Sequence, residues 1–219
     1  MVEVYSINID SQIAIEEYEY YITFLSKEKR ERLQRYYFQE DKRRSLYGEI
    51  MIRSLINERL GIDNANIIFS CNTFGKPYLI GYPNFHFNIS HSGEWVICGI
   101  GCNKLGVDIE KIIEKKDLIT KSIFTNNEYY DLIKTCEKDR FAYFYDLWTL
   151  KESYTKCIGK GLSIPLNSFS FEILKDNNIL SPPNNLYSFK KYSCISGYRI
   201  SVCSFEEVID DHIQNFNIY

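Results

Sequence analysis

The chain has 219 residues, of which 45% are hydrophobic and 25% are charged, and its formal net charge at pH 7 is −3. This length allows one large domain or two small ones packed together. The acidic balance argues against a dedicated nucleic-acid-binding protein, whose binding surface is usually basic, but it leaves room for a local basic site for a small anion. No apolar stretch approaches the ~20 residues of a membrane span, and the seven cysteines include no C-x-x-C pair. We therefore expect a cytoplasmic protein with reduced thiols, no membrane contact and no nucleic-acid partner.

The first half of the chain predicts a strand, two helices and three short strands. "MVEVYSINID" has the pattern of a strand, and "SKEKRERLQRYYF" predicts a helix that begins after Ser26, because serine is a favoured N-cap. "EDKRRSLYGEIMIRSLINERLG" carries an apolar stripe and predicts a second helix that ends at Gly61. The runs "NIIFS", "FHFNIS" and "EWVICGIG" are typical of short strands.

The second half repeats this order of elements. "NNEYYDLIKTC" and "KDRFAYFYDLWTLKESYTKCIG" predict helices, and "SFSFEIL" and "GYRISVCSF" predict strands. We interpret the chain as an α+β protein built by duplication of one unit, with an N-terminal half over residues 1–103 and a C-terminal half over residues 104–219. Clefts between two such halves commonly hold ligands.

One helical segment of the second half combines an acid, a cation and a tryptophan. In "WTLKESYTK" the side chains of Trp148, Glu152 and Lys156 recur every four residues and so lie along one helix edge. An ordinary interpretation is a solvated pair of Glu152 and Lys156, worth about 0.2–0.5 kcal/mol. The neighbouring tryptophan is unusual for a fully solvated edge, so we consider Glu152 a candidate site residue.

A second acidic segment precedes it. In "LGVDIEK" a strand would point Asp108 and Glu110 to one face and the intervening apolar residues to the other. Adjacent carboxylates repel each other unless a cation or a proton lies between them. The alternative is an edge strand with an acidic outer face. With Glu152 as a third acid, the set consists only of oxygen ligands, which a hard ion such as Mg²⁺ accepts.

These segments resemble the signature motifs of a known family. "GVDIE", followed some forty positions later by "WTLKESYTK", resembles the two signature segments of the 4′-phosphopantetheinyl transferases. "FGKPYL" and "FHFNISHSG" resemble the upstream segment of the surfactin-synthetase-activating (Sfp-like) type, which joins two homologous halves in one chain. The likeness covers most of the chain and is loose after about Leu180. It implies an α+β pseudo-dimer with its active site at the interface between the halves.

The resemblance assigns roles to the acidic segments. It implies that Asp108, Glu110 and Glu152 bind Mg²⁺, with Mn²⁺ as the alternative ion, and that this ion holds the pyrophosphate of coenzyme A. Glu152 is also implied as the base for the attacking serine hydroxyl. Lys156 would offset charge on the transferring phosphate, and His91 would reach a phosphate of coenzyme A.

The resemblance also implies a ligand for a basic segment upstream. Residues 27–44 are rich in lysine and arginine, interrupted by acids, which by itself is typical of a solvated helix face. Alignment with the family places Lys29, Arg32 and Arg44 near the 3′-phosphate of coenzyme A.

Two turns complete the implied nucleotide site. "GKPY" has the pattern of a turn, in which Gly75 is conformationally permissive and Pro77 restricts Lys76 to extended geometry. By itself this pattern is typical of a surface turn whose lysine has no special role. "NISHSG" ends a strand with hydroxyls, a histidine and Gly93, which suits a turn facing a phosphate. The coenzyme A contacts implied in these turns and on the catalytic helix are Gly75, Lys76, Pro77, Ser90, His91 and Lys156.

The predicted function is therefore transfer of 4′-phosphopantetheine from coenzyme A to a serine of an apo carrier protein, with release of adenosine 3′,5′-bisphosphate. We expect a monomer that serves carrier domains of peptide or polyketide synthetases, as in antibiotic biosynthesis, and in addition the acyl carrier protein of fatty-acid synthesis. The segment "CIGKGLSIPLNSFSF", with Lys160 and Leu162, would help to dock the carrier. A metal-dependent phosphohydrolase and a non-enzymatic coenzyme A or carrier-binding relative are the alternatives.

Overall fold

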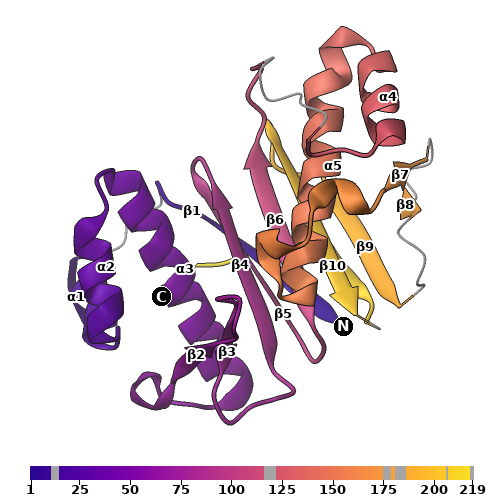
Figure 1. The fold of residues 1–219 in the computed structure, drawn as a ribbon. Coiled ribbons are helices and arrows are strands. Elements are labelled where there is room, and N and C mark those ends of the chain that lie inside the picture. Colours follow the sequence, from indigo (N-terminus) through magenta and orange to yellow (C-terminus); the bar gives the residue numbers. More distant parts are fainter. Residues whose placement is uncertain (11–14, 116–121, 175–178, 181–185, 206, 218–219) are drawn as a thin grey trace.

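The computed structural model shows two α+β halves that pack side by side (Figure 1). It describes residues 1–10, 15–115, 122–174, 179–180, 186–205 and 207–217. The main elements of the first half are β1 (Val2–Asn8), α1 (Ile15–Thr23), α2 (Lys27–Arg35), α3 (Gln39–Leu60), β2 (Phe69–Cys71), β3 (Pro77–Leu79), β4 (His86–Ser92) and β5 (Trp95–Gly101). Those of the second half are β6 (Leu105–Lys111), α4 (Asn126–Lys134), α5 (Glu137–Ile158), β7 (Glu172–Ile173), β8 (Ile179–Leu180), β9 (Tyr187–Tyr192), β10 (Tyr198–Phe205) and β11 (Ile209–Asn215).

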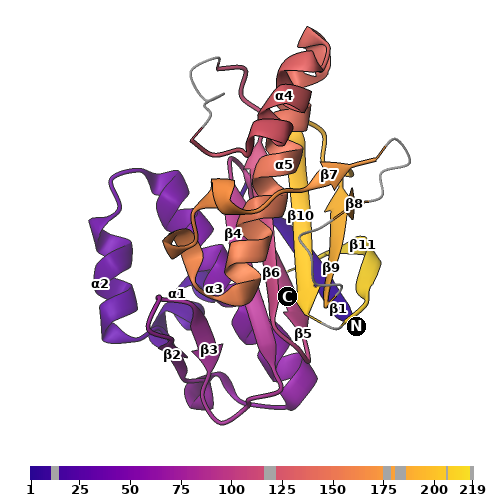
Figure 2. The same cartoon turned by 45° about the vertical axis from the view of Figure 1, so that its right-hand side comes forward.

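The same strand order occurs in both halves. The first sheet has the order β11-β1-β5-β4, and the second has the order β6-β10-β9. Within β1-β5-β4 and within β6-β10-β9, all neighbouring strands are antiparallel. The long helix α3 packs on β4 and β5, and the equally long α5 packs on β6 and β10 (Figures 1 and 2). This repeat confirms the predicted α+β pseudo-dimer in a single chain.

The last strand joins the sheet of the first half. β11 pairs in parallel with β1, and Val2 lies opposite Ile209. The division of the chain at residues 103 and 104 stays a prediction, because the C-terminal strand contributes to the first sheet.

The two long helices end in the way that their sequences predict. α3 and α5 each have 22 residues, and each is followed by a glycine in the left-handed conformation, Gly61 with φ 66° and Gly159 with φ 80°. Glycine occupies such positions without steric cost, and its N–H closes the last turn of the helix. Ser26 caps α2 as predicted, because its side chain accepts the N–H of Lys29 at 3.2 Å. None of the described helices is long and apolar enough to cross a membrane.

The two sheets meet along a seam between the edge strands β4 and β6, which we call the β4–β6 seam. No backbone ladder joins these strands among the described residues. Alternate side chains of β4 accept the backbone N–H groups of β6 instead. These bonds run from Val107 N to Asn88 Oδ1 at 2.8 Å, from Ile109 N to Ser90 Oγ at 3.4 Å and from Lys111 N to Ser92 Oγ at 3.1 Å.

The apolar face of β6 fastens the halves together. Val107 and Ile109 are fully buried, in a core cluster that also contains Val4 and Ile97 of the first half. Burial of a valine or isoleucine side chain contributes roughly 1.5–3 kcal/mol. The opposite face of β6, with Asp108 and Glu110, is turned toward β4 and α5. Since that face is covered, β6 is not an edge strand with a solvated acidic face.

Several short elements differ from the sequence prediction. The strand predicted over "SFSFEIL" is reduced to the two residues of β7, and that over "NIIFS" to the three of β2. Within "SFSFEIL", Phe169 O accepts from the buried amine of Lys151 at 2.6 Å, and Phe171 N donates to Glu128 at 2.9 Å. Leu166 O, just before this segment, accepts from the same amine at 2.8 Å. The backbone there is bonded to side chains and not to a neighbouring strand. The elements that the sequence patterns did not predict are α1, β3, β8, β9 and β11.

Candidate active site at the β4–β6 seam

Asp108 lies at the centre of the seam. It is 2% exposed, and its Oδ1 accepts hydrogen bonds from Lys156 Nζ at 2.5 Å and Ser90 Oγ at 2.9 Å. Its second oxygen, Oδ2, is buried and has no hydrogen-bond partner. Burial raises the pKa of Asp108 above its usual value, against the opposing effect of Lys156. A buried carboxylate oxygen without a partner is costly unless a cation or a proton reaches it.

Glu110 lies two residues further along the same face. Ser92 Oγ donates to Glu110 Oε2 at 2.9 Å. Burial and the negative charge of Asp108 raise the pKa of Glu110 to about 7, although hydrogen bonds from Ser92 and Trp148 favour its ionised form. The two carboxylates therefore form the repelling pair that the strand pattern predicted.

Helix α5 brings the third acid to the same place. It lies so close to β6 that a Cβ on Gly106 would come within 2.0 Å of Ser153 O and 2.4 Å of Cys157 N. Only glycine fits there, and this approach sets Glu152 and Lys156 beside Asp108. Burial and the charge of Asp108 raise the pKa of Glu152, whereas Lys156 lowers it.

The surroundings of Trp148 explain why a tryptophan lies on this helix edge. It is partly buried, its ring stacks on Phe144 with an interplanar angle of 16°, and it hydrogen-bonds toward Glu110. The edge of α5 is thus turned into the molecule at Trp148 and toward the seam at Glu152 and Lys156. A solvated helix edge with an isolated ion pair is excluded.

The carboxylates have the chemistry of a site for a hard cation. Within the part of the chain that the structure describes, no three Asp, Glu, His or Cys side chains converge closely enough to hold a metal ion as they stand. The partnerless Asp108 Oδ2 and the pKa values of Asp108, Glu110 and Glu152, which burial raises, nevertheless mark a group of buried carboxylates that Lys156 neutralises only in part. An oxygen-only ligand set of this kind fits Mg²⁺.

The end of β4 brings two predicted phosphate contacts to the seam. Ser90 is buried and also accepts a hydrogen bond from Lys156 Nζ at 3.0 Å. Desolvation and the positive charges of Arg44 and Lys156 lower the pKa of His91, so its ring is neutral at pH 7. Arg44 donates to Gly93 O at 2.6 Å and pairs with Asp41 at 2.5 Å. The segment that was predicted to face a phosphate thus has the cations of Arg44 and Lys156 beside it.

The remaining predicted contacts lie further away or turn elsewhere. Lys29 pairs with Glu49 at 3.5 Å, and Arg32 is exposed on α2. In the turn that carries Gly75 (φ 86°) and Pro77, the amine of Lys76 points to backbone carbonyls of the second half.

The predicted docking segment is described only in part. Lys160 is exposed, whereas the side chain of Leu162 lies outside the described residues. Its backbone forms a 3-10 turn over Gly161–Ser163 that directly follows α5.

Sequence reasoning missed Asn88 and Ser92, whose side chains join β4 to β6. The available signal was the alternation of polar residues at positions 88, 90 and 92 of a strand whose other face is apolar. It also missed Lys151, whose ammonium pairs with Glu128 at 2.8 Å in the interior.

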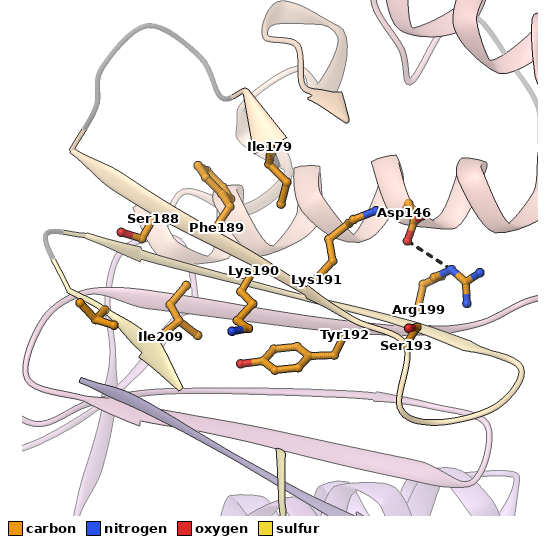
Figure 3. Close-up of a pocket in the computed structure, with 11 residues that line it drawn as sticks. Asp146, Ile179, Ser188, Phe189, Lys190, Lys191, Tyr192, Ser193, Arg199 and Ile209 are labelled. Atoms are coloured by element: carbon orange, nitrogen blue, oxygen red, sulfur yellow. Dashed lines mark hydrogen bonds and ion pairs between the residues drawn. The ribbon is translucent and has the colours of Figure 1, made fainter. Parts of the chain in front are cut away.

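A separate cavity of about 590 Å³ lies along β9, away from these carboxylates (Figure 3). Asp146 accepts from Lys191 at 3.1 Å and from Arg199 at 3.2 Å within it. Lys190, which also lines the cavity, pairs with Asp211 outside it. Its lining contains none of the predicted site residues.

Comparison with known proteins identifies the family. The family model described as "4′-phosphopantetheinyl transferase, N-terminal" matches residues 13–101, and that described as "4′-phosphopantetheinyl transferase superfamily" matches residues 104–203. The chain is 40% identical over 205 residues to 4′-phosphopantetheinyl transferase Sfp of Bacillus subtilis, covering 92% of each chain. It is 37% identical over 206 residues to 4′-phosphopantetheinyl transferase gsp of Aneurinibacillus migulanus, covering 93% of this chain and 86% of the relative.

More distant similarities extend to other kingdoms and to a solved structure. The human L-aminoadipate-semialdehyde dehydrogenase-phosphopantetheinyl transferase is 33% identical over 164 residues, which are 68% of this chain and 53% of that protein. A holo-(acyl-carrier-protein) synthase of Bacillus anthracis, solved in complex with coenzyme A, superposes with a TM-score of 0.41 and 15% identity over 48% of this chain and 96% of its own. The two family models together span both halves, and the carboxylates of the β4–β6 seam lie in the motifs that first suggested the family. The chain belongs to the 4′-phosphopantetheinyl transferase superfamily, and its relatives over nearly the whole length are of the Sfp type.

Proposed function

We propose that the protein transfers 4′-phosphopantetheine from coenzyme A to a serine hydroxyl of an apo carrier protein and releases adenosine 3′,5′-bisphosphate. The observation that carries this proposal is the buried, partnerless Oδ2 of Asp108 beside Glu110, Glu152 and Lys156, in a chain of this family. A transfer of this kind needs a base and groups that neutralise the charge of the phosphates. The seam has side chains for both tasks.

Asp108, Glu110 and Glu152 would hold Mg²⁺, or Mn²⁺ in its place, which supplies charge neutralisation on the pyrophosphate when bound. Lys156 bonds to Asp108 and to Ser90 and would turn to the transferring phosphate when that anion enters. Glu152 takes the proton of the serine hydroxyl, for which its raised pKa is suited. The serine oxygen forms the new bond to phosphorus, and the bond from that phosphorus to the bridging oxygen breaks.

The nucleotide would lie between the end of β4 and the basic residues of α2 and α3. Arg44 supports this placement, because it donates to Gly93 O and its charge acts on His91. Ser90 supports it as well, because it accepts from Lys156. His91 is neutral there at pH 7 and would donate a hydrogen bond to a phosphate. Further nucleotide contacts in this proposal are Lys29, Arg32, Gly75, the backbone of Lys76, and Pro77.

The proposed partners are carrier domains of peptide or polyketide synthetases and the acyl carrier protein of fatty-acid synthesis. The 3-10 turn after α5, with Lys160 and Leu162, would contribute to docking, because it directly follows the helix that carries Glu152. We also propose a monomeric cytoplasmic enzyme divided into halves at residues 103 and 104. The seven cysteines, all free, agree with a reducing compartment.

A single experiment tests the proposed function. The protein is incubated with coenzyme A, Mg²⁺ and an apo carrier, and the carrier is weighed by mass spectrometry. We expect the carrier to gain one phosphopantetheine group on its serine. Cleavage of coenzyme A without any gain in carrier mass would indicate a phosphohydrolase, and binding without reaction would indicate a non-enzymatic relative.

A further inference from the structure

The C-terminal end of α5 is capped by residues of the other half. The last carbonyls of a helix have no partner within it and need donors from elsewhere. The donors here are Asn72 and Lys76 in the turn between β2 and β3, which belongs to the first half. We call this pair the α5 clamp.

Lys76 places its ammonium among three carbonyl oxygens. Nζ donates to Leu105 O at 2.7 Å, to Lys156 O at 2.6 Å and to Cys157 O at 3.4 Å. An ammonium has three hydrogens, so its donor capacity is matched. None of the ion pairs within the described ranges involves Lys76, and burial lowers its pKa to about 8, so it is charged at neutral pH. A cation in this position also complements the negative end of the helix dipole.

Asn72 fixes the turn and touches the same helix end. Its Nδ2 donates to Gly159 O at 2.8 Å, while its Oδ1 accepts the N–H groups of Phe74 and Lys76, each at 2.9 Å. A Cβ on Gly159 would lie 3.2 Å from Asn72 Nδ2 and 3.3 Å from Lys76 Cδ. The turn is therefore packed closely on the end of α5.

Lys156 connects the clamp to the carboxylates. Its carbonyl is held by Lys76 at 2.6 Å, and its own amine lies 2.5 Å from Asp108 Oδ1. Loosening the last turn of α5 would therefore move the cation that faces the transferring phosphate. Misplacement of a positioned catalytic group by 1 Å can cost about a hundredfold in rate.

We propose that Asn72 and Lys76 are positioning residues, which clamp the last turn of α5 to the first half and thereby hold Lys156 and Glu152 at the seam. This inference rests on the proposed transfer reaction. It assigns the amine of Lys76 to helix α5 and not to a phosphate of the nucleotide.

The test compares Lys76→Met with Lys104→Met. Lys104 lines a cavity of about 190 Å³ together with Lys76, and its side chain is exposed. Its contact with α5 is made by its backbone carbonyl, which accepts from Cys157 Sγ at 3.2 Å and is kept in the variant, so Lys104→Met removes the same charge without removing that bond. We expect Lys76→Met to lower kcat about tenfold or more, with KM for coenzyme A changed less than about twofold. The preference for coenzyme A over dephospho-coenzyme A should stay as in the wild type, and Lys104→Met should retain wild-type kcat. A raised KM for coenzyme A with unchanged kcat would overturn the clamp and make Lys76 a nucleotide contact.

A second measurement works without substrate and separates this inference from the proposed function. Amide hydrogen exchange at residues 157–159 should be faster in Lys76→Met than in Lys104→Met or the wild type, in protein free of coenzyme A and carrier. Asn72→Ser removes the amide donor to Gly159 and keeps a hydroxyl that can accept within the turn. It should act in the same direction, and its effect should not add fully to that of Lys76→Met. Unchanged exchange in both clamp variants would overturn the proposal even if transfer is observed. A wild type without transferase activity would overturn only the proposed function.

Discussion

Lys151 Nζ lies 2.8 Å from Glu128 Oε2, and the two side chains are 0% and 1% exposed. Lys151 precedes Glu152 on α5, whereas Glu128 belongs to the capping box at the start of α4. The ammonium also donates to two carbonyls of the segment after α5, and Glu128 accepts the N–H of Phe171. This ion pair fastens α4 and the segment after α5 to the helix that carries the proposed base.

Removing one partner of this pair should destabilise the protein strongly. Glu128→Ala leaves the ammonium of Lys151 buried without a counter-charge, which typically costs about 3–5 kcal/mol. Denaturant unfolding followed by circular dichroism measures the loss. Asp211→Asn breaks the pair with Lys190, in which Asp211 is 80% exposed, and should lower stability far less, because solvent screens exposed ion pairs. Equal losses in the two variants would contradict the structural role of the buried pair.

The proposed metal site predicts a requirement for a divalent cation. Transfer should stop in excess chelator and return with Mg²⁺ or Mn²⁺, because only oxygen ligands are present. Asp108→Ala and Glu152→Ala should abolish transfer with the fold intact, and Glu110→Ala should reduce it less. Calorimetric titration with Mn²⁺ checks binding independently, with the exposed Glu58→Ala as control. Full turnover in chelator would rule out this mechanism.

The raised pKa of Glu110 predicts that the stability of the metal-free protein depends on pH. Its pKa is about 7 in the folded chain and 4.5 as a free side chain. The folded state therefore holds the proton more tightly, so ionisation costs stability as the pH rises from 4.5 to 7, and the whole cost is present above pH 7. A shift of this size corresponds to about 3 kcal/mol.

Glu110→Gln removes that cost in chelator. The variant should match the wild type near pH 4.5 and exceed it by about 3 kcal/mol in free energy of unfolding at pH 8, as measured by denaturant unfolding. Saturating Mg²⁺ should favour the wild type, since a bound ligand stabilises the folded state. A difference that is constant across this pH range would show that Glu110 ionises normally.

The basic residues predict discrimination between coenzyme A and its dephospho form. If Lys29, Arg32 and Arg44 contact the 3′-phosphate, loss of one contact should weaken coenzyme A binding about tenfold or more. Binding of dephospho-coenzyme A should change little, so the preference shrinks in each alanine variant. Arg35→Ala on the same helix, where Arg35 pairs with Glu31 at the surface, is the matched control. An unchanged preference in all three variants would assign these residues another purpose.

The sequence predicts those structural elements that depend on interactions between neighbouring residues. Ser26 and the two glycines after α3 and α5 act on the nearest turn of their own helix, so the helix ends could be predicted from neighbouring residues. The alternation around Asp108 likewise placed two acids on one face. The family motifs then indicated that Glu152 would join them.

The sequence does not predict contacts whose partners lie far away in the chain. Lys76 was expected at the nucleotide, but its amine is bonded 80 residues away to Lys156 O. A flexible side chain can reach many positions, and only the packing of the two halves decides which one it takes. The same holds for Ser92 and Glu110, because nothing near β4 in the sequence shows that β6 will lie beside it.

The pairing of β11 with β1 has a consequence for the order of folding during synthesis. Val2 is synthesised about 200 residues before its strand neighbour Ile209. One edge of β1 therefore stays open through most of translation, and exposed strand edges favour association with other chains. Loop closure over such a distance must precede the pairing, which makes this step a slow one. A growing chain of this protein thus depends on its final strand to close its first sheet.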